Sequence, residues 1–183
     1  ARGSVNIKAE NGEHDAVVTW LESLEVKVTP GGDSTRFIVH PTYKYEDTVL
    51  IEQIRIAFEV ALNVVPKGKK PVPASFEVQV FFKSNLGNYS GNSFGSLLTM
   101  LFVRELVKLN NPNVIPDINP GMAFTGAVNE SGRIISVGRR NIISKVKCIF
   151  FSGLSRFIIP HSDEATAIKK KKKLSKQWPD RKL

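Results

Sequence analysis

The chain has 183 residues, of which 42% are hydrophobic and 23% charged, so it is long enough for one domain with its own hydrophobic core. No apolar run approaches the roughly 18 residues of a membrane-spanning helix, which argues against a transmembrane segment. The single cysteine, Cys148, excludes an intramolecular disulfide, and we expect the protein in the cytoplasm or another reducing intracellular compartment.

The net charge of +9 is concentrated at one end of the chain. Residues 169–183 hold eight Lys or Arg and one Asp, and the rest of the chain is nearly neutral. A charge run of this kind predicts a solvated, flexible tail. The alternative is that the run Lys169–Lys173 forms a surface for nucleic acid or for an anionic membrane.

The N-terminal part of the chain reads as extended structure. Residues 1–15 are polar and predict a flexible segment. Apolar residues alternate over 24–28, the turn sequence "GGD" follows, and residues 34–40 again have the composition of a strand. These features predict a β-hairpin.

A helix and a strand are predicted next. Apolar residues recur over 45–65 with the spacing of one helical face, and Asp47 or Thr48 could cap the helix. A basic loop follows, and clean alternation over 75–82 then predicts a strand.

The second half begins with a loop of small residues, 83–92, that leads into an apolar pattern over 93–110. This pattern predicts a deeply buried helix. Residues 121–137 predict two strands joined by the turn "NESG", and residues 139–152 predict a helix that ends at Gly153, a typical C-terminal capping residue.

A short strand at 154–160 completes the series. The mixture of hairpins and helices predicts an α/β (α+β) fold with hairpin-rich sheets. We expect a single domain over 16–168, flanked by the flexible segment 1–15 and the basic tail 169–183.

Residues suited to metal or nucleotide chemistry are scarce. The three histidines are far apart in the sequence and there is one cysteine, so no zinc-ligand spacing occurs. A phosphate-binding glycine-rich loop is also missing from the sequence. We therefore expect no metal, no cofactor and no ATPase module in this chain.

Ser93 lies where the glycine-containing loop meets the apolar helix pattern. The free N–H groups and the positive dipole end of a helix N-terminus can stabilise an oxyanion beside such a serine. Serine is also among the commonest helix caps. The local pattern alone therefore leaves both roles open.

A catalytic serine needs a base, and a buried lysine can serve because desolvation lowers its pKa. Lys145 lies in the mostly apolar stretch "NIISKVKCIFF" and meets this condition. Lys147 is the alternative, and two residues apart the lysines cannot share a helix face. The simpler interpretation of either is an exposed helix lysine.

Three further features follow one another in a characteristic order. The sequence Gly91-Asn92-Ser93-Phe94-Gly95 precedes the apolar helix, and "FTGAVNESGRIISVG" occupies 124–138. A lysine-bearing helix, a glycine and a strand ending in "IIP" then follow, with Lys145, Gly153 and Pro160 at these places.

This series, from about Leu24 to Pro160, resembles the proteolytic domain of Lon-type proteases, whose fold the Ser/Lys processing proteases of birnaviruses share. The family's nucleophile lies in a pattern like (D/G)-x-S-A-G at the start of a long buried helix. The second segment is similar to the family pattern M-T-G-E-(I/V)-x-x-x-G-x-(V/I)-x-x-(I/V)-G. The ordered series carries the resemblance, because each motif alone is weak.

The resemblance implies a serine endopeptidase that hydrolyses peptide bonds through an acyl-enzyme, with Ser93 and Lys145 as the catalytic dyad. It also implies that Thr125 hydrogen-bonds the lysine. Gly126, Asn92 and Gly91 would support the site.

The implied substrate is a polypeptide, including the protein's own polyprotein or precursor. We expect it to lie extended along strand 75–82 or the loop 83–90 and to add a strand to the sheet. The alternative is a catalytically silent Lon-like domain that acts as an interaction or assembly module. The resemblance leaves the oligomeric state open.

Two departures from the family concern the site. Phe94 replaces the usual small residue after the nucleophile and is expected to narrow the site. Counting forward from Gly138 places Ile143 at the family's lysine position, whereas counting back from Pro160 places Lys145 there. We favour an insertion of two residues near 139–141, because a helix and its capping glycine fix the register better than a loop does.

Overall fold

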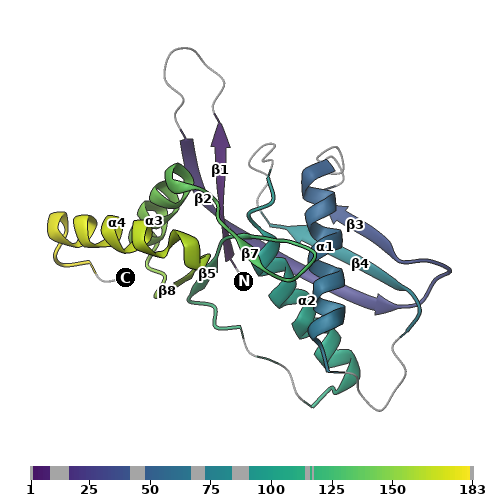
Figure 1. Ribbon diagram of the computed structural model, residues 1–183. Helices are drawn as coiled ribbons and strands as arrows, with labels where there is room; N and C mark the ends of the chain where they lie inside the picture. Colours follow the sequence, from purple (N-terminus) through teal and green to yellow (C-terminus); the bar gives the residue numbers. More distant parts are fainter. Residues whose placement is uncertain are drawn as a thin grey trace.

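The computed structural model describes residues 2–8, 17–41, 48–66, 73–83, 91–113, 116 and 118–181. This part is a mixed α and β structure with four α-helices and two sheets (Figure 1). The strands are β1 (Arg2–Lys8), β2 (Val17–Pro30), β3 (Arg36–His40), β4 (Phe76–Phe82), β5 (Met122–Phe124), β6 (Ala127–Val128), β7 (Ile134–Ile135) and β8 (Arg156–Ile158). The helices are α1 (Thr48–Val64), α2 (Gly95–Asn110), α3 (Arg139–Ser152) and α4 (Glu164–Gln177), and a 3₁₀ turn, η2 (His161–Asp163), precedes α4.

The larger sheet has the strand order β3-β4-β2-β1-β5-β8. Strand β2 is 14 residues long and holds this sheet together, because its first half pairs with β1 and its second half with β4, both antiparallel. Strands β5 and β8 extend the sheet beyond β1 in parallel. Strands β6 and β7 form a separate antiparallel pair.

The predicted hairpin between the strands at 24–28 and 34–40 is wrong. Both strands form, but β4 lies between them, antiparallel to β2 and parallel to β3. The turn after β2 is held by the residue before β4, because Gly31 N donates to Ser75 O at 3.1 Å. A "GGD" sequence indicates a turn but not which strand becomes the partner. Strand β4, which buries every second residue, occupies the position between β2 and β3 instead.

Both ends of the chain are more ordered than the sequence predicts. The N-terminal segment contains β1, which pairs with β2 and β5, whereas residues 9–16 lie outside the described part. The basic tail is helical up to Gln177, and the boundary expected at 168/169 falls inside α4. Ala167 and Leu174 are buried, and α4 packs against α3. The flexible interpretation is therefore wrong for 169–177, because this apolar pair is spaced to share one helical face.

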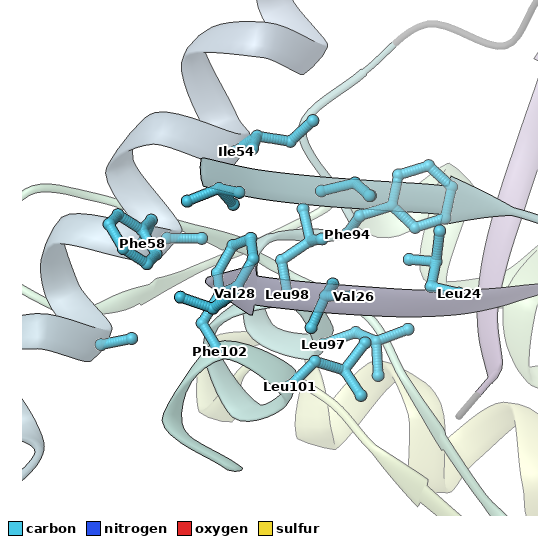
Figure 2. Close-up of a cluster of buried hydrophobic side chains, with 14 of the residues drawn as sticks. Leu24, Val26, Val28, Ile54, Phe58, Phe94, Leu97, Leu98, Leu101 and Phe102 are labelled. Carbon is cyan, nitrogen blue, oxygen red and sulfur yellow. The ribbon is translucent and has the colours of Figure 1, made fainter. Parts of the chain in front are cut away.

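The main core lies between α1, α2 and the second half of β2 with β4 (Figure 2). Leu24, Val26 and Val28 point from β2 into this core, as expected of alternate strand residues. At its centre Phe58 of α1 meets the rings of Phe76 and Phe102 edge-on, with centroids 5.5 and 5.4 Å away. Edge-to-face pairs of this kind add to the gain from burial alone.

Helix α2 is buried on one face only. Leu97, Leu98 and Phe102 are fully buried, whereas Met100 and Leu109 are 43% and 37% exposed. The expectation of a deeply buried helix therefore holds for one face of α2 and not for the other. Apolar residues on an exposed face are common and carry no burial signal of their own.

Helix α3 packs on the other half of the sheet, against β1 and the first half of β2. It covers 139–152 as predicted and ends at Gly153, whose φ of +77° is the left-handed conformation of a C-terminal cap. In the described part, no helix is both long and apolar enough to cross a membrane.

Candidate active site

Ser93 lies in the turn that leads into α2. Gly95 N donates to Asn92 O at 3.1 Å and closes this turn, and Gly91 before it has a φ of +123°, which favours glycine. Phe94 is the residue directly before α2, and no side-chain hydrogen bond caps the helix. Ser93 is therefore not the cap of α2, and its partly exposed side chain is accessible for another role.

The backbone of Gly126 holds the Ser93 turn from the other side. Gly126 N donates to Ser93 O at 3.0 Å, and Ser96 N donates to Gly126 O at 2.9 Å. A side chain at Gly126 is excluded, because its φ is +133° and a Cβ atom would lie 2.5 Å from Ile134 Cγ2. The predicted strand at 121–128 breaks here into β5 and β6, so that Gly126 can face Ser93.

Gly95 and Gln53 form a second contact at the start of α2 that the sequence analysis missed. The buried Gln53 side chain of α1 donates to Val128 O at 2.9 Å and accepts from Val128 N at 3.3 Å. A Cβ atom on Gly95 would lie 2.5 Å from Val128 N. The sequence did contain one indication of this contact, because Gln53 is a polar residue on the apolar face of the predicted 45–65 helix.

Phe94 does not narrow the site, contrary to the expectation. Its side chain is 3% exposed and lies in the main core (Figure 2). There its ring meets the ring of Phe82 edge-on, with centroids 5.4 Å apart. The residue after the serine points into the core, so a large apolar side chain is accommodated there.

The structure brings Ser93 and Lys145 together. Lys145 Nζ lies 3.3 Å from Ser93 Oγ, and the lysine is only 1% exposed. The other two candidates for this position lie elsewhere, since Ile143 is partly exposed and Lys147 is exposed on α3. The count back from Pro160 therefore gives the register that the structure has.

Burial lowers the pKa of Lys145 to about 7, because the ammonium form loses its hydration inside the protein. Cys148, three residues further along α3, opposes this effect, since a thiolate there would favour the ammonium. Burial also raises the pKa of the Cys148 thiol itself. A substantial fraction of Lys145 is therefore neutral near pH 7, as a general base requires.

Thr125 lies beside Gly126, and its N–H donates to Ile158 O at 3.0 Å. Its hydroxyl is fully buried and has no hydrogen-bond partner among the described residues. The hydrogen bond predicted between Thr125 and Lys145 is therefore not formed in this structure.

Strand β4 cannot take an extended substrate as the sequence analysis expected. Both of its edges are paired, one with β2 and the other with β3, over nearly its whole length. A further strand needs a free row of backbone N–H and C=O groups. The other expected location, the loop 83–90, lies almost wholly outside the described residues.

In the part of the chain that the structure describes, no group of three or more His, Cys, Asp or Glu side chains is arranged to hold a metal ion. Comparison with known protein families finds no match to this chain. Comparison with curated proteins finds no related sequence either.

Proposed function

We propose that the protein is a Lon-like serine endopeptidase with a Ser93/Lys145 dyad. The observation that supports this function is the distance of 3.3 Å between Lys145 Nζ and Ser93 Oγ. A buried lysine within hydrogen-bonding distance of a serine hydroxyl has a clear chemical use as a base. The pKa of about 7 suits that use near neutral pH.

In the proposed reaction, neutral Lys145 accepts the hydroxyl proton of Ser93 as Oγ attacks the carbonyl carbon of the scissile peptide bond. The resulting ammonium gives its proton to the leaving amine as the C–N bond breaks, which leaves an acyl-enzyme on Ser93. Water then attacks the ester with Lys145 again as the base, and the acid product leaves. The buried Thr125 hydroxyl is a candidate acceptor for the lysine ammonium during this cycle.

The oxyanion of the tetrahedral intermediate needs donors close to Ser93. The amides of Gly95 and Ser96 are already engaged with Asn92 O and Gly126 O. We therefore assign the principal oxyanion contact to the amide of Ser93 itself, at the positive end of α2. We propose that the substrate is a polypeptide segment in extended conformation, because such a segment leaves its carbonyl groups accessible to the partly exposed Ser93.

The test is labelling of Ser93 by a fluorophosphonate, followed by mass spectrometry of the labelled peptide. Ser93→Ala should abolish the labelling, and Lys145→Ala should reduce it by at least about 100-fold, a typical contribution of a general base. Lys147→Ala is the matched control and should react like the wild type. Equal labelling of the wild type and Lys145→Ala would leave the catalytically silent domain as the better interpretation.

A second candidate function rests on α4. Lys169, Lys172, Lys173 and Lys176 have the spacing of one helical stripe and are exposed. They lie on the face of α4 opposite the buried residues that contact α3. The stripe therefore favours binding of a polyanion, and we propose single-stranded nucleic acid.

Two aromatic rings lie beyond the end of this stripe. Trp178 and Phe151 are 42% and 36% exposed, and their centroids are 5.1 Å apart. Exposed rings next to cationic residues can stack on unpaired bases. The stripe and the rings together fit a single strand better than a duplex.

Fluorescence anisotropy with labelled oligo(U) tests this second function. The affinity should fall steeply with salt and should be lost in Lys172→Glu/Lys173→Glu. Lys27→Glu/Lys108→Glu, at exposed positions on β2 and α2, serves as the control with the same charge change. Unchanged affinity in the double variant, or binding to phosphatidylserine vesicles only, would contradict a nucleic-acid surface on α4.

A further inference from the structure

A carboxylate outside the dyad is tied to the start of the helix that carries Lys145. Asp163 of η2 is 4% exposed. Its Oδ1 accepts from Ser136 Oγ at 2.5 Å, and its Oδ2 accepts from Val137 N at 2.9 Å. Both oxygens of one buried carboxylate are thus used on two consecutive residues of the β7–α3 connection.

The same connection is tied to the first turn of α3. Gly138 N donates to Ser136 Oγ at 3.0 Å, so the hydroxyl that Asp163 holds also holds the residue before the helix. Ile142 N donates to Gly138 O at 3.0 Å, and Asn141 Nδ2 donates to Val137 O at 2.8 Å. These hydrogen bonds form a chain from Asp163 to the first turn of α3.

The start of α3 determines which side chain faces Ser93. Each residue of an α-helix advances the chain by about 1.5 Å and turns it by about 100°. A slip of two residues would bring Ile143 or Lys147 toward the serine in place of Lys145. The sequence allows this slip, because the connection before α3 has no motif that fixes its length.

We propose that Asp163 is a positioning residue, which holds Ser136 and Val137, fixes where α3 begins and so keeps Lys145 beside Ser93. The rotation of α3 about its own axis is set by its buried contact with α4, which includes Ile142, Val146 and Leu174. Asp163 lies immediately before α4, so one segment supplies both the anchor and the contact. The proposal rests on the proposed dyad for its catalytic consequence only.

Two of the groups near the lysine are Ser93 and Cys148. Ser93 lies 3.3 Å away in the turn before α2, and Cys148 is on α3 itself. If the start of α3 loosens, Lys145 gains water, and its pKa should rise toward the ordinary value of 10.5. This rise separates a positioning role from a purely structural one, which would lower stability alone.

The experiment compares Asp163→Asn and Ser136→Ala with Glu164→Gln. Asparagine keeps the size but cannot accept both hydrogen bonds, and Ser136→Ala removes the linking hydroxyl. Glu164 is the matched control, because it is the adjacent exposed acid and its ion pair is with the exposed His161. Two quantities are measured against pH: the ¹³Cε chemical shift of Lys145 in ¹³C-lysine-labelled protein, and fluorophosphonate labelling of Ser93.

In Asp163→Asn we expect the midpoint of both titrations to rise by about one pH unit, with about tenfold slower labelling at pH 6, because the neutral fraction of Lys145 falls tenfold per unit. Ser136→Ala should shift the midpoint in the same direction, and Glu164→Gln should not. A lower melting temperature with an unchanged midpoint would overturn the proposal. If Asp163→Asn does not fold, Ser136→Ala decides by the same criterion.

The NMR titration keeps this proposal separate from the proposed function. If wild-type Ser93 is not labelled, the peptidase proposal fails, but the Lys145 midpoint still reports its position. A midpoint that stays near 7 in both Asp163→Asn and Ser136→Ala would then refute the positioning role by itself.

Discussion

At the scale of single residues, the site depends on a lysine whose proton affinity is set by burial. Lys145 is an ordinary amine in an unfolded chain and a weak base in the folded one, because the protein around it cannot hydrate the ammonium. Cys148 is nearby and partly buried, and its thiol becomes charged only at a pH well above the pKa of Lys145. The pH dependence of the proposed serine chemistry is therefore a direct readout of the Lys145 environment.

The rate of Ser93 labelling should rise with pH and level off, with a midpoint at about 7. The rate should rise with pH because the neutral amine of Lys145 is the active form, and its fraction increases as the pH passes the pKa of Lys145 in the folded protein. Cys148→Ser should leave this midpoint nearly unchanged, because burial raises the pKa of the Cys148 thiol and the thiol is therefore uncharged near pH 7. A rate that still rises tenfold between pH 8 and 9 would instead indicate a solvated lysine or direct attack by hydroxide.

At the scale of elements, the position of Ser93 depends on how closely α2 approaches β6. Gly95 is the point of contact, and a methyl group there would clash with Val128 N and with the Gln53 side chain. A strained packing substitution of this kind costs about 1–3 kcal/mol. The backbone must then move, and the turn that carries Ser93 is directly before it.

Gly95→Ala should therefore lower the free energy of unfolding by about 1–3 kcal/mol and also slow Ser93 labelling. Met100→Ala on the exposed face of α2 is the control, with an expected change within about 0.5 kcal/mol and normal labelling. Urea unfolding followed by circular dichroism measures the first effect. A Gly95→Ala protein with wild-type stability and labelling would contradict this prediction, because it would show that β6 can move away from α2 without loss of stability.

Elements with a strong local period were predictable from the sequence, whereas their pairing was not. The helix at 139–152, its cap at Gly153 and the strand at 75–82 follow from spacing and capping rules that act within a few residues. The position of β4 between β2 and β3 depends on which distant strand buries more apolar area, and the sequence within any one strand does not specify this partner.

The candidate site divides in the same way. Ser93 and Lys145 could be named from their sequence contexts, but their distance depends on the β7–α3 connection and the Asp163 carboxylate. Gln53 looked like one more residue of an amphipathic helix, although its side chain holds β6. Polar groups that act on a distant backbone leave no periodic signal in the sequence.

At the scale of the whole molecule, the proposed dyad joins two halves of the fold. Ser93 belongs to the half with α1, α2 and β4, whereas Lys145 belongs to the half with α3, α4, β5 and β8 (Figure 1). Strand β2 runs through both halves, and Gly126 connects them at the site. Burying an ionisable lysine at this junction should have a cost in stability.

Lys145→Met should stabilise the protein, and most strongly below pH 7. The folded pKa of about 7 lies below the unfolded value of 10.5, so between these values the unfolded state binds one more proton and the wild type gains stability as the pH rises. Below pH 7 both states are protonated and the full cost of the buried ammonium applies, about 5 kcal/mol or less. The difference in free energy of unfolding between variant and wild type, measured by urea unfolding, should therefore be largest at pH 6 and shrink steadily toward pH 10.

The control is Lys147→Met, at an exposed position of the same helix, which should show a small difference in free energy of unfolding at every pH. A Lys145→Met effect that does not change with pH would mean that the lysine is hydrated in the folded protein, and the proposed general base would then lose its physical basis.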